Sequence, residues 1–274
     1  MEFQIINNFT SNILNHLCAS QNGNVAITGI GFYMLMAAIK FRVQGRSYDQ
    51  LSRIIEHDFH QLYDPHTWIH TRTAKKWNFL RFLANAIPDM RSTLYTSCYL
   101  NDHFKKISNV LFNVFAQNMN FSYASESYRR IHILIRRQIH GIKTKLLDEI
   151  VIRNDRLIFI HTLYFRSDWL TEFDPKLTKP EEFYDETGRV LRVPMMNQYY
   201  YVKLRLPKFK ILVQNDFVEI LKHFGITDIF DRNRSDFGRM TNETVFIGNL
   251  MHLLYLAVDE YSVYKNTNHE EGTG

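Results

Sequence analysis

Residues 157–165 read LIFIHTLYF, and this run, with the landmarks that follow it up to Met196, decides the fold. The run is apolar, aromatic and β-branched with a single polar interruption, which is typical of a strand buried on both faces of a large sheet. It is too short to cross a membrane. Behind it come Trp169, FDP at residues 173–175 and VPMM at residues 193–196.

The composition describes a globular protein with a sizeable core. The chain has 274 residues, of which 45% are hydrophobic and 14% aromatic, and its net charge is +5. Such a mild basic bias is compatible with a surface for polyanions, and general solubility explains it as well. No phosphate-binding loop, nucleophile elbow or CxxC pair is present, so no cofactor and no nucleic-acid partner is expected.

The compartment is predicted from the cysteines and the N-terminus. Cys18 and Cys98 are the only cysteines, too few for a disulfide framework, so a reducing compartment is expected. The residues after Met1 show neither the basic region nor the apolar region that a signal peptide has. We therefore expect a cytoplasmic location, with an extracellular one as the alternative, and no membrane partner.

The pattern of apolar and capping residues predicts several helices and an early strand. Helices are expected at residues 3–17, 32–41, 48–55, 103–115, 126–140 and 216–224, and the early strand at residues 24–28. The polar residues 266–274 are expected to form a mobile tail.

Basic residues on two of these segments are candidate polyanion-binding groups. On the segment 126–140, Arg129 with Arg136 and Arg130 with Arg137 are each seven residues apart, so four guanidinium groups share one helix face. Lys75 and Lys76 lie between Trp68 and Trp77. Both sets suit a sulfated or phosphorylated partner, and an ordinary solvated helix face is the alternative.

Histidines cluster between His57 and His70. His66 and His70 have the four-residue spacing of helical zinc ligands, which favours metal binding. Against this, Pro65 breaks the segment and no HExxH pattern or cysteine is near. We expect a solvated connection and no metal.

The order of motifs along nearly the whole chain resembles the serpin family. The matching segments are NVAITG (24–29), the block from Leu157 to Met196, LPKF (206–209), LKHFGITDIF (221–230) and NLMHLLYLAVDE (249–260). The reduced length and the composition are most similar to a shortened poxvirus serpin. The resemblance implies an α+β fold of one domain, residues 1–274, with a helical N-terminal cluster packed on a large, mainly antiparallel central sheet. Compared with the family, a block is missing between Tyr201 and Leu206, so the second sheet is expected to be reduced.

In serpins a protease cleaves an exposed loop and is trapped while the loop inserts into the central sheet. The resemblance places the breach, where insertion begins, at Trp169, and the hinge at Glu260 and the residues Ser262, Val263, Tyr264 and Lys265. The family has Gly, Thr and a run of Ala there. Because strand alternation would bury Lys265, this hinge is expected to insert poorly. A second register puts the hinge on residues 270–273, and in either register the chain ends before a scissile bond.

The resemblance also identifies the shutter, a hydrogen-bonded gate under the central sheet. The family uses two serines, an asparagine and a histidine, and the matching positions are Thr28, Gly31, His161 and His252. Two neighbouring buried histidines would disfavour each other's protonation. We therefore hypothesise a His161–His252 pair that loosens below pH 6; two separately satisfied core histidines are the alternative.

These features predict a viral, serpin-like protein that modulates the host response and is not an enzyme. It is expected to be non-inhibitory, truncated before or within its reactive loop, and to bind a host protein or a heparin-like polyanion. The alternative is an active inhibitor of a host serine or cysteine protease.

Overall fold

The computed structural model describes residues 2–87, 89–143, 156–165, 167–199 and 203–261 of the chain. It has two compact units, the first within residues 1–163 and 213–254 and the second within residues 164–212 and 255–274. Each unit has apolar clusters of its own. The single domain predicted from the sequence stays a prediction.

The first unit contains most of the helices. Its helices are α1 (Glu2–Ser20), α2 (Gly29–Arg42), α3 (Gly45–Ser52), α4 (Arg72–Ala84), α5 (Asp102–Phe112), α6 (Ala124–Gln138) and α7 (Phe217–His223), with short 3-10 turns η1 (His60–Leu62), η2 (Trp68–His70) and η5 (Asp228–Phe230). Its strands are β1 (Met90–Thr96) and β2 (Val114–Asn118). Strands β3 (Arg156–Phe165), β7 (Phe209–Asp216) and β8 (Phe246–Val258) begin or end in it and continue into the second unit.

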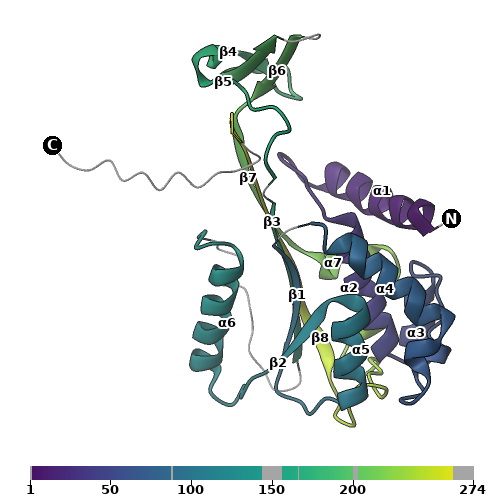
Figure 1. Cartoon of the computed structure of the whole chain (residues 1–274). Helices are drawn as coiled ribbons and strands as arrows, with labels where there is room; N and C mark the ends of the chain where they lie inside the picture. The colour runs from purple at the N-terminus through teal and green to yellow at the C-terminus, as the bar shows by residue number, and fades with distance from the viewer. Residues whose placement is uncertain (1, 88, 144–155, 166, 200–202, 262–274) are drawn as a thin grey trace. The chain divides into compact units, whose positions relative to one another are not determined.

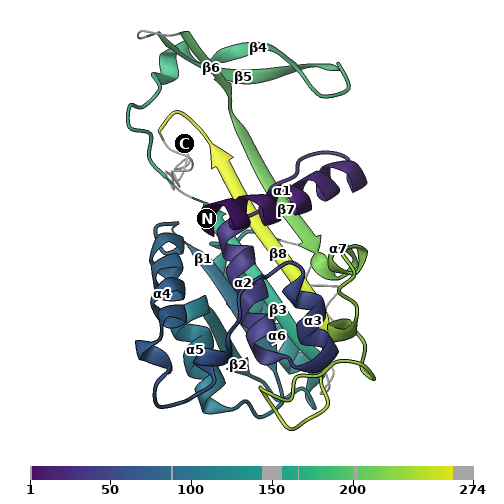
Figure 2. The same cartoon turned by 90° about the vertical axis from the view of Figure 1, so that its right-hand side faces the viewer.

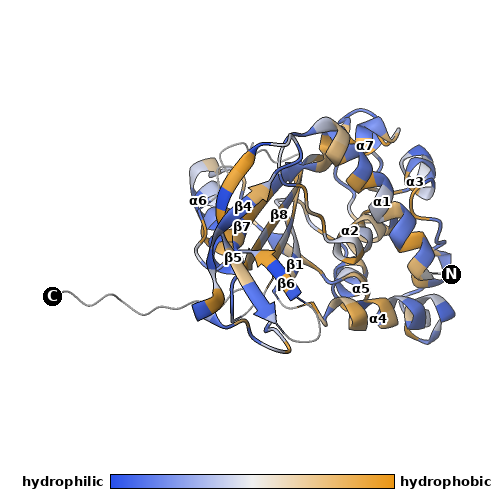
Figure 3. Cartoon of the chain, turned by 90° about the horizontal axis from the view of Figure 1, so that it is seen from above, coloured by the Kyte–Doolittle hydropathy of each residue, from blue (hydrophilic) through white to orange (hydrophobic). Residues whose placement is uncertain are grey.

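The central sheet has five strands in the order β2-β1-β3-β8-β7. β1 pairs antiparallel with β3 and parallel with β2, so the sheet is mixed. In Figure 1 the helix α6 lies on one face of β1 and β3, and α2, α4 and α5 lie on the other. Figure 2 shows this second helical group facing the viewer, and the view from above in Figure 3 shows the same three layers.

The core explains why residues 157–165 contain so few polar side chains. Leu157 and Phe159 pack in the large cluster with the helical group, whereas Ile158 and Ile160 pack in a smaller cluster with α6. Because consecutive residues of a strand point to opposite faces, both faces of β3 are buried. This confirms the predicted α+β fold with a helical group packed on a large sheet.

The second unit contains a three-stranded antiparallel sheet. Its strands are β4 (Lys179–Tyr184), β5 (Val190–Tyr199) and β6 (Lys203–Pro207), preceded by the turn η4 (Pro175–Leu177). VPMM lies on β5, and only Met195 and Met196 of this motif are buried. The reduced second sheet expected from the sequence is therefore present as a small sheet.

Two local predictions were wrong. Residues 24–28 form no strand, because they lead directly into α2, with Thr28 as its N-cap. The helix predicted over residues 103–115 ends at Phe112, since Asn113 adopts a left-handed conformation with φ of 56°. The chain then turns into β2, which an asparagine at this position allows more readily than most residues.

No helix among the described residues is long and apolar enough to span a membrane.

Candidate functional site

Three side chains from distant parts of the chain meet beneath the central sheet. Thr28 lies at the start of α2, His161 lies in β3 and His252 lies in β8. The two imidazole rings stack with their centroids 5.3 Å apart and their planes inclined by 19°. The structure thus brings together the positions that the sequence assigned to the shutter, although its role as a gate stays a prediction.

Thr28 links the two histidines by hydrogen bonds. Its Oγ1 atom lies 2.6 Å from Nε2 of His161 and 3.3 Å from Nε2 of His252. On the far side, Nδ1 of His161 lies 2.7 Å from Oγ of Ser92. Nδ1 of His252 has no hydrogen-bond partner among the residues that the structure describes. Ser92, on β1, is a member of the cluster that the sequence analysis missed, since nothing marks its partner before β1 and β3 are paired.

These contacts are satisfied by two neutral rings. His252 can donate from Nε2 to the Thr28 hydroxyl, which then donates to Nε2 of His161, and His161 donates from Nδ1 to Ser92. This order leaves the unpartnered Nδ1 of His252 as a bare acceptor, which costs less to bury than an N–H group without an acceptor. Protonating His252 would place an N–H group at Nδ1, where no described acceptor lies. Protonating His161 would make its Nε2 a donor to the Thr28 hydroxyl, which would then lose the acceptor of its own proton.

Burial reinforces the neutral state. His161 is 1% exposed and His252 is fully buried. Burial lowers the pKa of His161 from its ordinary value to about 4. The pKa of His252 also lies well below its ordinary value, because of burial first and the neighbouring His161 second.

Gly31, the fourth shutter position, is shaped by His161. A Cβ atom at residue 31 would lie 2.5 Å from Sδ of Met90 and 2.7 Å from Nε2 of His161. These distances are too short for any side chain without displacement of a neighbour. The absence of a side chain at Gly31 therefore makes room for the imidazole ring of His161.

In the second unit, Trp169 is fixed by the residues that precede the expected hinge. Its Nε1 atom donates to the carbonyl of Asp259 at 2.7 Å, and its ring meets Phe173 edge-on. The amide of Phe173 in turn donates to the carbonyl of Glu260 at 2.9 Å. The segment after β8 is thus held at the main-chain carbonyls of Asp259 and Glu260.

Glu260 is the proposed hinge residue that the structure describes. Its carboxylate accepts hydrogen bonds from Nζ of Lys208 and from Oγ1 of Thr178, both at 2.8 Å. Burial alone would raise the pKa of this carboxyl, but these partners outweigh burial and the pKa lies below its ordinary value. The other hinge positions, Ser262, Val263, Tyr264 and Lys265, lie outside the described residues.

The basic residues predicted to bind polyanions do not form one surface. Arg129, Arg130, Arg136 and Arg137 are all exposed on α6. Ile131 and Ile135 are buried on the opposite side of this helix. Lys75 and Lys76 belong to α4, which lies on the other face of the sheet (Figure 1). Lys76 reaches Nδ1 of His57 at 3.2 Å, whereas Lys75 is exposed.

The histidine-rich connection contains local contacts. Nδ1 of His60 lies 2.6 Å from Oδ2 of Asp58, and the Asp64 carboxylate accepts from the amide of His66. No group of three or more histidine, cysteine or acidic side chains is arranged to hold a metal ion within the part of the chain that the structure describes.

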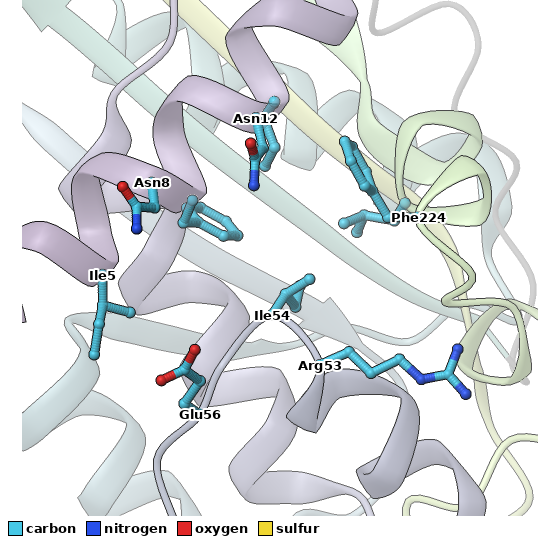
Figure 4. Close-up of a pocket in the computed structure, with 10 residues that line it drawn as sticks. Ile5, Asn8, Asn12, Arg53, Ile54, Glu56 and Phe224 are labelled. Atoms are coloured by element: carbon cyan, nitrogen blue, oxygen red, sulfur yellow. The ribbon is translucent and has the colours of Figure 1, made fainter.

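A surface cavity that the sequence analysis did not foresee lies between α1, residues 53–56 and the end of α7 (Figure 4). Its volume is about 570 Å³, open solvent included. Phe9, Ile13 and Leu221 form a buried floor, while Asn8 and Arg53 belong to the exposed rim. The periodicity of residues 3–17 predicted an amphipathic helix but could not predict where α7 would meet it.

The fold and the polar cluster define a class of protein. A profile of the family described as "Serpin (serine protease inhibitor)" matches residues 4–204 and 198–271. Because these ranges cover most of the sequence, the chain belongs to the serpin family. Serpins are protease inhibitors and not enzymes. The two ranges meet at residues 198–204, next to the place where the sequence predicts a missing block.

Relatives share the fold at low identity. Glia-derived nexin of Rattus norvegicus is 20% identical over 316 residues, covering 90% of this chain and 78% of the relative. Serpin B10 of Papio anubis is 24% identical over 275 residues, covering 77% and 67% respectively. The solved structure of native protease nexin-1 with heparin matches with a TM-score of 0.76 and 18% identity, covering 94% of this chain and 87% of that one. At these identities, the structural likeness establishes the fold alone.

Proposed function

We propose that this chain is a non-inhibitory serpin of a virus, which modulates the host response by binding a host protein or a sulfated polyanion through α6. The observation that carries the binding proposal is the face of α6 opposite its buried isoleucines. The inhibitory alternative is disfavoured by the hinge.

The α6 face concentrates positive charge without internal neutralisation. Arg129, Arg130, Arg136 and Arg137 form no ion pair with any described residue. Other cations of the chain do have carboxylate partners, such as Arg189 with Asp185. Unpaired guanidinium groups are strong donors to sulfate and phosphate oxygens. The relative crystallised with heparin supports this kind of partner for the fold.

The hinge sequence supports the non-inhibitory reading. Glu260 is held by Lys208 and Thr178, and the residues that follow it are larger than the small residues that loop insertion requires. On strand alternation, Val263 and Lys265 would enter the core face of the sheet, and a buried unpaired ammonium is unfavourable by several kcal/mol. The two free cysteines and the composition support the proposal of a viral protein acting in the cytoplasm of the infected cell, with an extracellular location as the alternative.

Heparin affinity chromatography tests the binding proposal. The pair variants R129A/R136A and R130A/R137A are each expected to elute at lower salt than the unmodified protein, because each removes two phosphate- or sulfate-binding groups. The matched control R189A/K222A also removes two cations, but both have carboxylate partners. Equal elution of all three variants would refute the α6 site.

Incubation with proteases tests the inhibitory alternative. A panel of trypsin-like, elastase-like, granzyme-like and caspase-like enzymes is expected to yield no SDS-stable covalent complex. A complex with any of them would show that the loop inserts despite Val263 and Lys265, and the inhibitor reading would replace ours.

A further inference from the structure

Helix α4 presents cationic and aromatic side chains on one exposed face. On an ideal helix Arg72, Lys75, Phe79 and Phe82 fall within roughly 80° of one another. The residues buried on the opposite side are Ala74, Trp77, Leu80 and Ala84. Phe79 and Phe82 therefore point away from the core, and we refer to the four exposed residues as the α4 face.

The two phenylalanines are unusually accessible for this residue type. Phe79 is 55% exposed and Phe82 is 72% exposed. Ile69, in the turn η2 just before the helix, is 53% exposed. Scattered single apolar residues on a surface need no explanation, but two exposed phenylalanines three residues apart on one helix face make this face a candidate interaction surface.

Turn η2 and helix α4 themselves carry charge of only one sign. No acidic residue occurs between Thr67 and Ile87, and neither Arg72 nor Lys75 forms an ion pair with a described residue. Lys106 of α5 stands over the ring of Trp68 at 5.9 Å and adds a further cation beside η2. The partner must therefore combine negative charge with an apolar layer.

We propose that the α4 face binds the surface of an anionic lipid bilayer. Phe79 and Phe82 would enter the boundary between headgroups and acyl chains, while Arg72 and Lys75 would contact anionic headgroups. A sulfated glycan is a poorer fit, because it would neutralise the cations but leave both phenylalanines in water. The sequence alone predicted no membrane partner, since the position of the phenylalanines opposite the buried face emerges only from the folded helix.

Flotation with lipid vesicles tests the proposal. The full chain is mixed with phosphatidylcholine vesicles that contain or lack phosphatidylserine, and the fraction that floats is measured. We expect binding only to the vesicles with phosphatidylserine. F79S/F82S should weaken it at least about tenfold, and R72A/K75A by roughly 25-fold at about fivefold per cation. The matched control F3S replaces a phenylalanine that is 57% exposed on α1 and should bind normally.

The outcomes separate this site from the polyanion site on α6. F79S/F82S should retain its heparin elution, and R129A/R136A should retain vesicle binding. All variants change exposed side chains, and an unchanged thermal melt verifies that they fold. The proposal is overturned if the unmodified protein does not float, if F79S/F82S floats equally well, or if pure phosphatidylcholine binds as strongly. Phenylalanine-dependent binding of an acidic protein without flotation would likewise replace the lipid surface by a protein partner.

Discussion

Acidification from pH 7.5 to pH 5.5 should destabilise the protein through the two buried histidines of the shutter. In the folded chain His161 and His252 are neutral, since burial lowers both pKa values below their ordinary value. In the unfolded chain both titrate near their ordinary pKa of about 6.5. The unfolded state therefore binds more protons below that pH, and folding free energy is lost as the pH falls from about 6.5 towards about 4.

The magnitude follows from this difference in proton binding. For one histidine that stays neutral when folded, the free energy of unfolding falls by about 1.4 kcal/mol between pH 7.5 and pH 5.5. Two such residues give about 2.7 kcal/mol, because the folded pKa of His161, about 4, is still well below the final pH. For a chain of this size, that loss corresponds to a fall in Tm of roughly 5–10 °C.

Urea unfolding at the two pH values measures the effect. The chain has 12 histidines, so the contribution of the pair is obtained by difference from variants. H161N should lose about 1.4 kcal/mol less than the unmodified protein on acidification, and H161N/H252N about 2.7 kcal/mol less. The control H66N replaces an exposed histidine and should show the full loss.

Two results would refute the reasoning. Equal acid-induced losses in H161N/H252N and the unmodified protein would mean that the pair does not resist protonation. A larger loss in the double variant would mean that the folded state binds protons at these rings, in which case the order of donors through Thr28 is wrong.

Two further substitutions test the packing of the first unit. G31A should lower the free energy of unfolding by about 1–3 kcal/mol, because its Cβ would overlap the His161 ring. Adding H161N to the same chain should recover about 1 kcal/mol or more of this loss. A double-mutant cycle measured by urea unfolding checks both values. R42M should be neutral or stabilising by about 1–3 kcal/mol in the same assay. The guanidinium group of the fully buried Arg42 makes one weak hydrogen bond, to Sδ of Met240 at 3.2 Å, and its Nε and Nη2 atoms have no partner within the described part of the chain. A loss above about 2 kcal/mol would indicate a partner for these groups.

The elements that the sequence predicted well are those whose pattern is enforced by burial. The run 157–165 could be assigned to a strand covered on both faces because both sets of alternate residues in it are mainly apolar. In the structure Phe159 and Ile160 accordingly pack in two different clusters, one on each face of the strand. The end of α5 could not be predicted in this way. A single left-handed residue, Asn113, ends the helix there, and the apolar residues that follow fit a helix or a strand equally well.

The shutter marks a second limit of sequence reasoning. The resemblance identified its four positions separately, but it could not reveal that Gly31 and His161 compete for the same space or that Ser92 completes the chain of hydrogen bonds. The contact with Ser92 depends on the register of β1 against β3, in which Ser92 faces His161. The contact with Gly31 depends on how α2 packs against β3.

In the predicted assignment of the shutter, His161 takes the place of the family's asparagine, and this assignment makes the stability of the gate depend on pH. An amide side chain does not titrate, so an asparagine at this position adds no pH dependence to the free energy of unfolding. An imidazole in the same buried place keeps the hydrogen bonds at neutral pH, yet it loses folding free energy once the unfolded chain can be protonated. Because the His161 ring occupies the space that a side chain at residue 31 would need, the predicted acid sensitivity and the predicted cost of G31A both depend on His161.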